Sequence, residues 1–293
     1  MLLSSFIFGS SFEDYFKLRF YEKDNKERNK FVTTADQYEF QNKLNEKEAK
    51  IYFKDKEKFY DKFSDYIERD YFIVDENTKI AEFKSWSNGK NVLFCKPVKG
   101  AAGDGIIKYD IRGNSKKKIY NELQKKKSKY LVEPKIIQHR KMKELNPGTL
   151  NTLKIITVQS DKNKEVEILG ATIRMGTEGF IDNMSAGGIG AVVDLDTGKV
   201  CSKGIRKDIT ERDYEYHPIT NKEICGFKIP HWQETKNFVR ELAIVVEGIK
   251  TVGWDIAIGE DRPILIEGNE NWNKDTLQIP ANEGIKDQLL KYY

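Results

Sequence analysis

At 293 residues the chain is long enough to bury a hydrophobic core, as one large domain or as two to three smaller ones. Its 39% hydrophobic and 33% charged residues are typical of a soluble globular protein, and no apolar run approaches the roughly 20 residues that cross a bilayer. The 50 basic and 46 acidic residues leave a net charge of only +4, which gives little attraction to nucleic acid.

The first eight residues, MLLSSFIF, lack a basic leader, and the acidic Glu13 and Asp14 follow soon after them. This pattern is a poor match to a signal peptide, so we expect residues 1–8 to be a buried part of the fold. The cysteines are odd in number and lack the spacing of a metal or redox motif. We therefore expect reduced thiols and a cytoplasmic protein. The three cysteines are Cys95, Cys201 and Cys225.

Residues 1–70 are predicted to form a short helical region, because apolar residues recur there at helical spacing, as at Phe59 and Phe63. The pattern of apolar residues changes over residues 71–132, where short strand-like runs surround one helical stretch near 115–128. This order predicts a small α+β unit in which a helix lies across a sheet.

Residues 133–293 are predicted to be a larger α+β section. A helix is expected over 232–250, where apolar residues mark one buried face, and a short helix is expected at the C-terminus. The predicted fold class is therefore α+β, divided into 1–70, 71–132 and 133–293. The strand-like runs read NTLKIITVQ, EVEILGATIRMG, AVVDLDTGKV, VGWDIAIG and PILIEGN.

The segment 92–109 joins a strand that carries Lys96 to a loop with Gly100, Gly103 and Gly105. Backbone amides in such a loop can approach phosphates, and a fixed lysine adds a positive charge. The pattern alone is weak, because glycine-rich turns between strands are common. The segment 129–139 is an apolar strand that runs into Glu133, and by itself it looks like an ordinary buried strand.

The most specific segment is 253–269, which reads as an antiparallel hairpin. Glu267 and Asn269 are two residues apart on the second strand and therefore project from the same face. If the loop has an odd number of residues, for instance 260–262, Asp255 lies directly opposite Glu267. Opposed carboxylates destabilise a sheet unless a cation lies between them, and these oxygen ligands suit magnesium. A two-residue loop would place Asp255 on the other face.

These segments, in this order, resemble the ATP-grasp superfamily, and they are most similar to its sugar-transfer-associated group. The resemblance spans residues 50–275 and implies an ATP-grasp fold, with 71–132 as a lid subdomain and 133–293 as the subdomain that carries the magnesium site. The motifs that carry it read VEPKIIQH, LNPGTLNTLKIITV, IRMG, IDNMSAGGIGAVVDLDTG and GWDIA…ILIEGN.

The resemblance also implies an ATP-binding set. It makes Lys96 the lysine that contacts the ATP phosphates, and Lys56 the earlier lysine, although Lys54 and Lys58 compete for that role. Glu133 opens the adenine-binding linker. The main chain of the linker would contact the base at Lys135 and Ile136, and the loop glycines Gly103 and Gly105 would lie at the phosphates.

The remaining residues follow from the same resemblance. Asp255, Glu267 and Asn269 match ligands of two magnesium ions, while Arg174 and Lys154 match cations near the transferred phosphoryl group. Two further assignments concern the rims of the site. Asn183 lies in a glycine-rich loop that would shape the acceptor site and bind the nucleotide. Glu144 would contact the ribose.

The function that the resemblance implies is ATP-dependent ligation of a carboxylate to an amine through an acyl phosphate. The carboxylate would belong to a sugar, such as a uronic acid on a nucleotide sugar or glycan, used for cell-surface polysaccharide. The partners would be this carboxylate and a small amine. A kinase on the same scaffold and a non-catalytic nucleotide-binding protein remain as alternatives.

Overall fold

The computed structural model describes residues 1–100, 105–177, 182–184, 187–211 and 213–292. The chain forms two compact units: a larger unit of Met1–Lys50 with Gln138–Tyr293, and a smaller unit of Ile51–Ile137. Both are mixed α+β units, as predicted. The observed units differ from the three-part division, because residues 51–70 pack within the smaller unit, where the Lys56 amide bonds the Val98 carbonyl.

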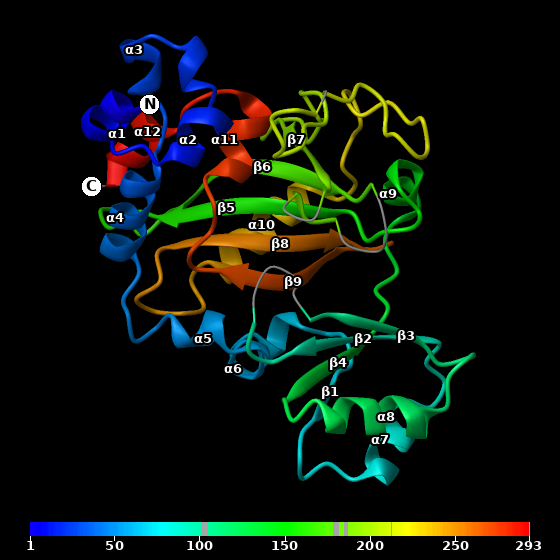
Figure 1. Ribbon diagram of the computed structural model, residues 1–293. Helices are drawn as coiled ribbons and strands as arrows, with labels where there is room; N and C mark the ends of the chain where they lie inside the picture. The colour runs from blue at the N-terminus through cyan, green and yellow to red at the C-terminus, as the bar shows by residue number, and fades with distance from the viewer. Residues whose placement is uncertain (101–104, 178–181, 185–186, 212, 293) are drawn as a thin grey trace. The chain divides into compact units, whose positions relative to one another are not determined.

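The larger unit is built on an antiparallel sheet with the strand order β7-β6-β5-β8-β9 (Figure 1). Its central strands are rich in β-branched residues and buried on both faces, as expected of strands covered on either side. The strands are β5 (Thr152–Gln159), β6 (Val166–Met175), β7 (Ile189–Val193), β8 (Thr251–Ile258) and β9 (Pro263–Asn269).

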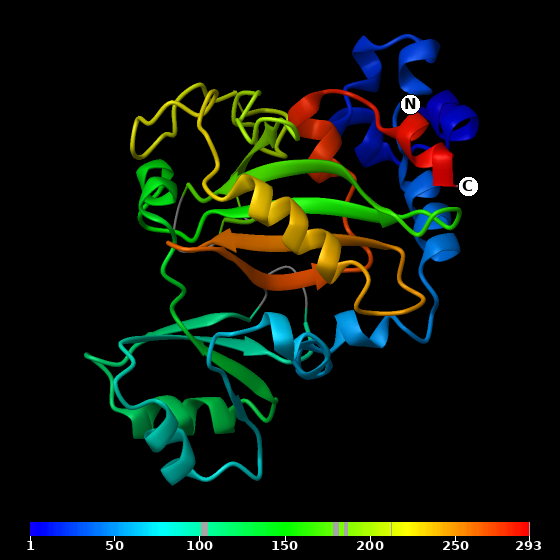
Figure 2. The ribbon, with the colours of Figure 1, turned by 180° about the vertical axis from the view of Figure 1, so that it is seen from behind.

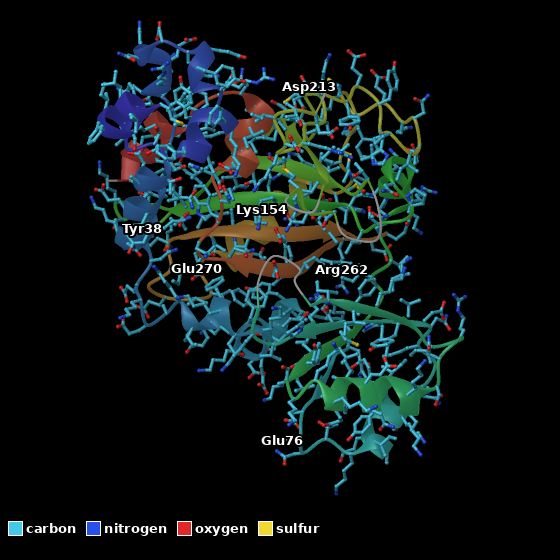
Figure 3. All side chains as sticks on the ribbon, viewed as in Figure 1. Tyr38, Glu76, Lys154, Asp213, Arg262 and Glu270 are labelled. Atoms are coloured by element: carbon cyan, nitrogen blue, oxygen red, sulfur yellow. The ribbon has the colours of Figure 1, made fainter. Side chains whose placement is uncertain are left out.

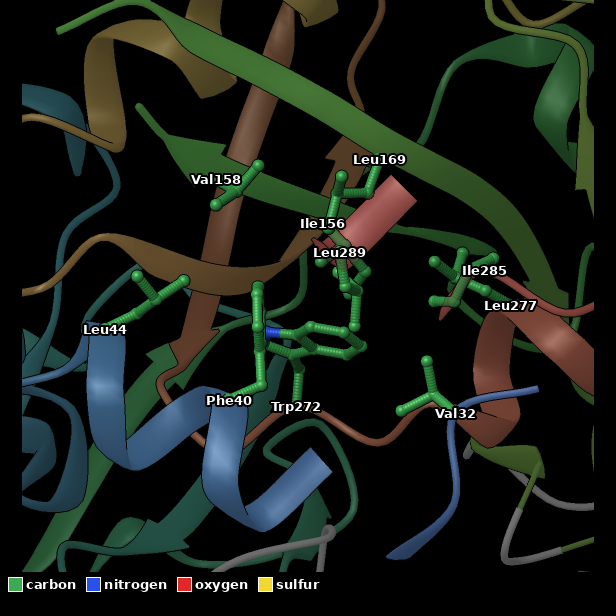
Figure 4. Close-up of a cluster of buried hydrophobic side chains, with 10 residues drawn as sticks. All are labelled: Val32, Phe40, Leu44, Ile156, Val158, Leu169, Trp272, Leu277, Ile285 and Leu289. Atoms are coloured by element: carbon green, nitrogen blue, oxygen red, sulfur yellow. The ribbon is translucent and has the colours of Figure 1, made fainter. Parts of the chain in front are cut away.

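Helices cover both faces of this sheet. Helix α10 (Trp232–Leu242) runs across one face, as Figure 2 shows, and packs on β5, β6 and β9. On the other face α4 (Thr34–Leu44) and the C-terminal segment enclose a core around Trp272, whose ring meets Phe40 edge-on at 6.4 Å (Figure 4). Ile156 of β5 belongs to this core, so Lys154, two residues earlier, projects from the same face.

The N-terminal helices lie beside the C-terminal ones in both views (Figures 1 and 2). The expectation that residues 1–8 are buried is wrong: Leu2, Leu3, Phe6 and Ile7 are between 62% and 87% exposed. None of the described helices is both long enough and apolar enough to cross a membrane. These helices are α1 (Leu2–Phe8), α2 (Phe12–Lys17), η1 (Phe20–Glu22), α3 (Asn25–Arg28), α9 (Arg140–Leu145), α11 (Asp275–Ala281), α12 (Lys286–Leu289) and η4 (Leu290–Tyr292).

The smaller unit has an antiparallel sheet with the order β1-β4-β2-β3. Helix α8 packs Ile119 and Leu123 on one face of it, so the prediction of a helix across a sheet is confirmed. The strands are β1 (Phe72–Val74), β2 (Val92–Pro97), β3 (Ile107–Asp110) and β4 (Tyr130–Pro134). The helices are α5 (Ile51–Lys54), α6 (Lys56–Lys62), η2 (Ser64–Tyr66), α7 (Ile80–Trp86) and α8 (Lys116–Lys125).

Candidate active site

The β8–β9 hairpin places Asp255 directly opposite Glu267, and Gly253 opposite Asn269. The juxtaposition that an odd-numbered loop would give is therefore present, but the loop is even and the cause is different. Ile258 pairs with Pro263, which leaves an even loop of 259–262, and the register then shifts between Asp255 and Ile256. This β-bulge adds the one residue that turns Glu267 onto the face of Asp255; bulges often re-aim side chains beside active sites.

The neighbouring strands bring two cations to the same face. Lys154 of β5 is the cross-strand partner of Asp255, and Arg174 of β6 is the partner of Thr152. Because strand residues alternate between faces, Lys154, Arg174 and Asp255 all project from one side. Lys154, labelled in Figure 3, lies over the middle of the sheet. Four strands therefore contribute side chains to one charged patch, which we call the sheet-face site.

Asp255 is the most strongly held carboxylate of the sheet-face site. Its Oδ1 lies 2.5 Å from Lys154 Nζ, and its Oδ2 lies 3.2 Å from Arg174 Nη2. Burial alone would raise the pKa of Asp255, but Arg174, Lys154 and a hydrogen bond from Glu267 outweigh it and lower the pKa. The Asp255 carboxylate is therefore buried and charged at neutral pH.

Two residues of this network, Thr152 and Asp182, were not identified from the sequence. Arg174 donates to Thr152 Oγ1 from Nε at 3.1 Å and from Nη2 at 2.7 Å, and its Nε lies 3.7 Å from Asp182 Oδ2. The Thr152 hydroxyl in turn donates to Asp182. Burial raises the pKa of Asp182 even though Arg174 opposes the shift. Thr152 is two residues before Lys154 on the same strand and therefore projects from the same face. This spacing is the feature of the sequence that indicates Thr152.

The donor set of the sheet-face site fits a hard divalent cation. Asp255 Oδ1 is buried and accepts no hydrogen bond of good geometry, although the Lys154 ammonium lies close to it. Asn269 donates from Nδ2 toward the Gly253 carbonyl at 3.5 Å. In the described part of the chain no three His, Cys, Asp or Glu side chains gather as a metal cluster. The oxygen donors that this face could offer to a divalent cation are the Asp255 and Glu267 carboxylates and the amide oxygen of Asn269, with other ligands from phosphates.

In the smaller unit, Lys96 of β2 and Glu133 of β4 lie on the sheet face opposite to α8. The buried Glu133 carboxylate contacts the Lys96 ammonium, the Arg69 guanidinium and the Tyr60 hydroxyl. Burial would raise the pKa of Glu133, but Lys96 and Arg69 hold it at about 2. Tyr60 of α6 and Arg69, in the segment before β1, stand in no motif that points to this site.

The other predicted nucleotide contacts of the smaller unit are only partly described. Lys56 Nζ donates to the Gly100 carbonyl at 2.8 Å, which ties this lysine to the glycine-rich segment. Gly105 has a φ of +72°, and a Cβ there would lie 2.9 Å from Pro97 Cγ, so glycine is required. The Lys135 amide already donates to the Val92 carbonyl at 3.0 Å. Gly103 lies outside the described residues, and Ile136 is half-buried.

Two predicted residues of the larger unit have local partners. The Asn183 carbonyl accepts a hydrogen bond from the Gly188 amide at 3.1 Å, within the glycine-rich loop. Glu144 pairs with Lys222 at 2.6 Å in a solvent-exposed ion pair.

Of the predicted site residues in the larger unit, the structure gathers Lys154, Arg174 and Asp255 into one network, with Glu267 and Asn269 on the same face.

Solved structures similar to this chain are ATP-grasp enzymes. D-alanyl-alanine synthetase A from Vibrio cholerae matches at 13% identity and a TM-score of 0.52, over 84% of this chain and 66% of that chain. N5-carboxyaminoimidazole synthetase from Staphylococcus aureus, complexed with ADP, matches at 9% and 0.53, over 85% and 53%. The ATP-grasp ligase PsnB, complexed with a phosphomimetic variant of its minimal precursor, Mg and ADP, matches at 13% and 0.51, over 85% and 61%.

At these identities the likeness shows the fold, and the chain spans between about half and two thirds of the solved chains it matches. No curated protein sequence matched. The family model described as sugar-transfer associated ATP-grasp matches residues 35–292, which is most of the chain. The ATP-grasp fold and the predicted resemblance are thus confirmed, and the chain belongs to the sugar-transfer associated ATP-grasp family.

Proposed function

We propose that the protein is an ATP-dependent ligase that joins a carboxylate to an amine through an acyl phosphate and forms ADP. Its family membership supports this proposal, as do fold neighbours that are ligases or synthetases, two of them complexed with ADP. The observation that carries it is the sheet-face site, where Asp255 opposes Glu267 beside two fixed cations, Lys154 and Arg174.

The proposed reaction has two steps. An oxygen of the substrate carboxylate attacks the γ-phosphorus of ATP, the bond from that phosphorus to the β–γ bridging oxygen breaks, and ADP leaves. The amine nitrogen then attacks the acyl carbon, the carbon–oxygen bond to phosphate breaks, and the nitrogen loses a proton. Catalysis of such transfers depends on positioning and on neutralising charge rather than on covalent help from the protein.

The chain's own residues divide this work. Asp255, Glu267 and Asn269 would hold two magnesium ions, which when bound supply positive charge to the ATP phosphates. Arg174 is fixed by Thr152 and Asp255, so its guanidinium is pre-oriented toward charge that develops on the transferred phosphoryl group. Lys154 would add a second positive charge there.

In the smaller unit the proposal concerns Lys96 and its neighbours. Lys96 would contact an ATP phosphate, while its pairing with Glu133 keeps the ammonium at a fixed place on β2. The linker after Glu133 would bind adenine through the main chain of Lys135 and Ile136, with Lys56 and Gly105 near the phosphates. Asn183 would act at the nucleotide or acceptor, and Glu144 at the ribose.

We further propose that the carboxylate belongs to a sugar, such as a uronic acid on a nucleotide sugar or a glycan. The family description as sugar-transfer associated supports this substrate class. The amine would be an amino acid or another small amine, and the product would enter a cell-surface polysaccharide. The reaction would take place in the cytoplasm, where ATP is available and cysteine thiols stay reduced.

The test is a screen of nucleotide-sugar acids against small amines, with ADP and inorganic phosphate both measured. A ligase releases ADP and phosphate in equal amounts and yields an amide, identified by mass. ADP release with a phosphorylated acceptor and no free phosphate would instead show a kinase. Absence of any acceptor-stimulated ADP formation, with retained ATP binding, would show a non-catalytic nucleotide-binding protein.

A further inference from the structure

The first helix of the larger unit is oriented with its apolar side toward solvent. Leu2, Leu3, Phe6 and Ile7 form an i, i+1, i+4, i+5 stripe, and each is at least 62% exposed. Ser4 points inward instead, where it is 2% exposed and hydrogen-bonded to Ser10 at 2.9 Å. The side of α1 that carries Ser4 and Phe8 is therefore packed on the protein, and the side that carries Leu2, Leu3, Phe6 and Ile7 is uncovered.

Helix α2 repeats this arrangement. Phe12 and Phe16 are four residues apart on one face and are 55% and 45% exposed, while Asp14 is buried between them. Phe16 continues into an exposed aromatic group, since its ring lies 6.5 Å from that of Tyr21. We call the six residues the N-terminal apolar face: Leu2, Leu3, Phe6, Ile7, Phe12 and Phe16.

Helix α2 cannot rotate to bury its phenylalanines, because Asp14 fixes it. The Asp14 carboxylate accepts from the Ser11 and Thr34 amides at 2.9 and 2.8 Å, and from Lys274 Nζ at 2.6 Å. Lys274 is itself buried, so turning Asp14 outward would leave a buried cation without this partner. The exposure of Phe12 and Phe16 is therefore imposed by the rest of the fold.

We infer that the N-terminal apolar face is the interface with a second copy of this chain. Large exposed apolar patches on soluble domains mark interaction sites. The six side chains are between 45% and 87% exposed. At roughly 200 Å² each they offer on the order of 800 Å², which is about what each partner contributes to a standard interface. Aromatic residues such as Phe6, Phe12 and Phe16 are also enriched in interface cores.

The charges at the rim of the face select a second copy over an anionic bilayer. Apart from the buried Asp14, the four charged residues nearest in the chain form two ion pairs of opposite sign, Glu13 with Lys17 and Arg19 with Glu22, so their charges balance. A twofold contact brings identical surfaces together, so each acid of one copy can face a base of the other. A balanced rim offers no net attraction to acidic lipids, whose binding needs clustered lysines and arginines.

Sedimentation of the full chain over a range of concentrations tests this inference. The wild type is expected to approach twice the 34.0 kDa chain mass, and Phe6→Glu is expected to weaken self-association at least about a hundredfold. The matched control is Ile244→Glu, because Ile244 is also in the larger unit and is 59% exposed. It should leave the dimer intact. Leu3→Ser is a milder second variant, and circular dichroism verifies the fold of each.

Hydrogen exchange gives an independent readout, since the amides of residues 2–16 should become protected as the concentration rises. A wild type that stays at the monomer mass would overturn the inference, and so would a dimer that survives Phe6→Glu and Leu3→Ser while Ile244→Glu breaks it. Flotation with phosphatidylcholine vesicles, with and without phosphatidylserine, tests whether the face binds a membrane instead. Vesicle binding by a monomeric wild type that Phe6→Glu abolishes would assign the face to a membrane instead.

Discussion

Asp255 carries a buried negative charge that Lys154 and Arg174 neutralise, and Glu267 lies opposite it on the next strand. Like charges this close are unfavourable in a sheet, so the pair persists only because cations surround it. The sequence predicted the carboxylates, the amide and both cations of this site. It could not predict Thr152 and Asp182, because hydroxyl and carboxyl partners of a buried arginine have no fixed spacing along the chain.

Asp255→Asn should reduce turnover at least about a hundredfold, because it removes the charge of a proposed metal ligand without changing its shape. Circular dichroism must accompany the assay, because Lys154 and Arg174 lose a neutralising charge in this variant. The measurement is ADP release, together with Mn²⁺ binding by electron paramagnetic resonance as a readout separate from activity. Asp161→Asn, at an exposed ion pair with Lys250, is the control and should change neither. Normal Mn²⁺ binding by the Asp255 variant would remove it from the metal site.

Lys96→Ala should lower the maximal rate at least about a hundredfold, because it removes a positive charge from the phosphoryl transition state. The fold should survive, since Glu133 keeps Arg69 and Tyr60 as partners. Lys117→Ala on the exposed side of α8 is the matched control. If Lys96→Ala raised only the ATP requirement and kept the full rate at saturation, Lys96 would serve ground-state binding alone.

Glu133 should make the free energy of unfolding depend on pH in the acidic range. Its pKa is about 2 in the folded protein and near 4.5 when unfolded, so its contribution is complete above about pH 4.5 and is lost as the pH falls toward 2. The shift corresponds to about 3 kcal/mol. Glu133→Gln should therefore flatten the pH dependence of urea unfolding by about that amount between pH 5 and 2. Identical pH profiles for both proteins would contradict this assignment.

At the scale of elements, the strands and their faces were predictable, and the details of their connections were not. The hairpin over 253–269 was recognised because apolar runs flank a polar turn, yet a bulge has no composition signal and was missed. The prediction that residues 1–8 are buried rests on their apolar composition alone. The structure holds this segment through the Ser4–Ser10 hydrogen bond, and it holds the next helix, α2, through Asp14 and Lys274, which are 260 residues apart in the chain.

Gly253 on β8 shows how tightly the sheet-face site is packed against the core. A Cβ at this position would lie 2.5 Å from Trp272 Cβ and 3.0 Å from Ile156 Cδ1. Gly253→Ala should therefore lower the free energy of unfolding by about 1–3 kcal/mol. Urea unfolding followed by tryptophan fluorescence measures this. Gly113→Ala has open space around its Cβ and should leave stability unchanged; equal stabilities of the two variants would show that the β8 backbone yields freely.

At the scale of the whole molecule, charge is divided unevenly between the two units. Residues 51–137 contain 20 basic and 13 acidic residues, a net charge of +7, while the rest of the chain contains 30 and 33, a net charge of −3. The overall +4 predicted little attraction to polyanions, but it averages over this difference. The position of the unit boundary could not be read from composition, because α5 and α6 resemble the helices that precede them.

This asymmetry predicts that ATP binding depends on salt. An anionic nucleotide is attracted to the basic smaller unit, and that attraction is screened as the Debye length falls from about 10 Å at 0.1 M salt to about 3 Å at 1 M. The KM for ATP should rise several-fold over this range in potassium chloride, while the KM for the amine changes little. An ATP KM that is independent of salt would show that only short-range contacts hold the nucleotide.

Because of the bulge in the β8–β9 hairpin, Asp255 and Glu267 share a face only when the turn has an even number of residues. Eleven residues separate Asp255 from Glu267, an odd number reached by a four-residue turn plus one bulged residue. A turn shorter or longer by one residue would send one carboxylate to the opposite face unless the bulge were lost at the same time. The even turn and the single bulged residue thus compensate each other. A related hairpin can gain or lose two turn residues and still keep both acids on one face. It can gain or lose one residue only if the bulge is lost or acquired at the same time.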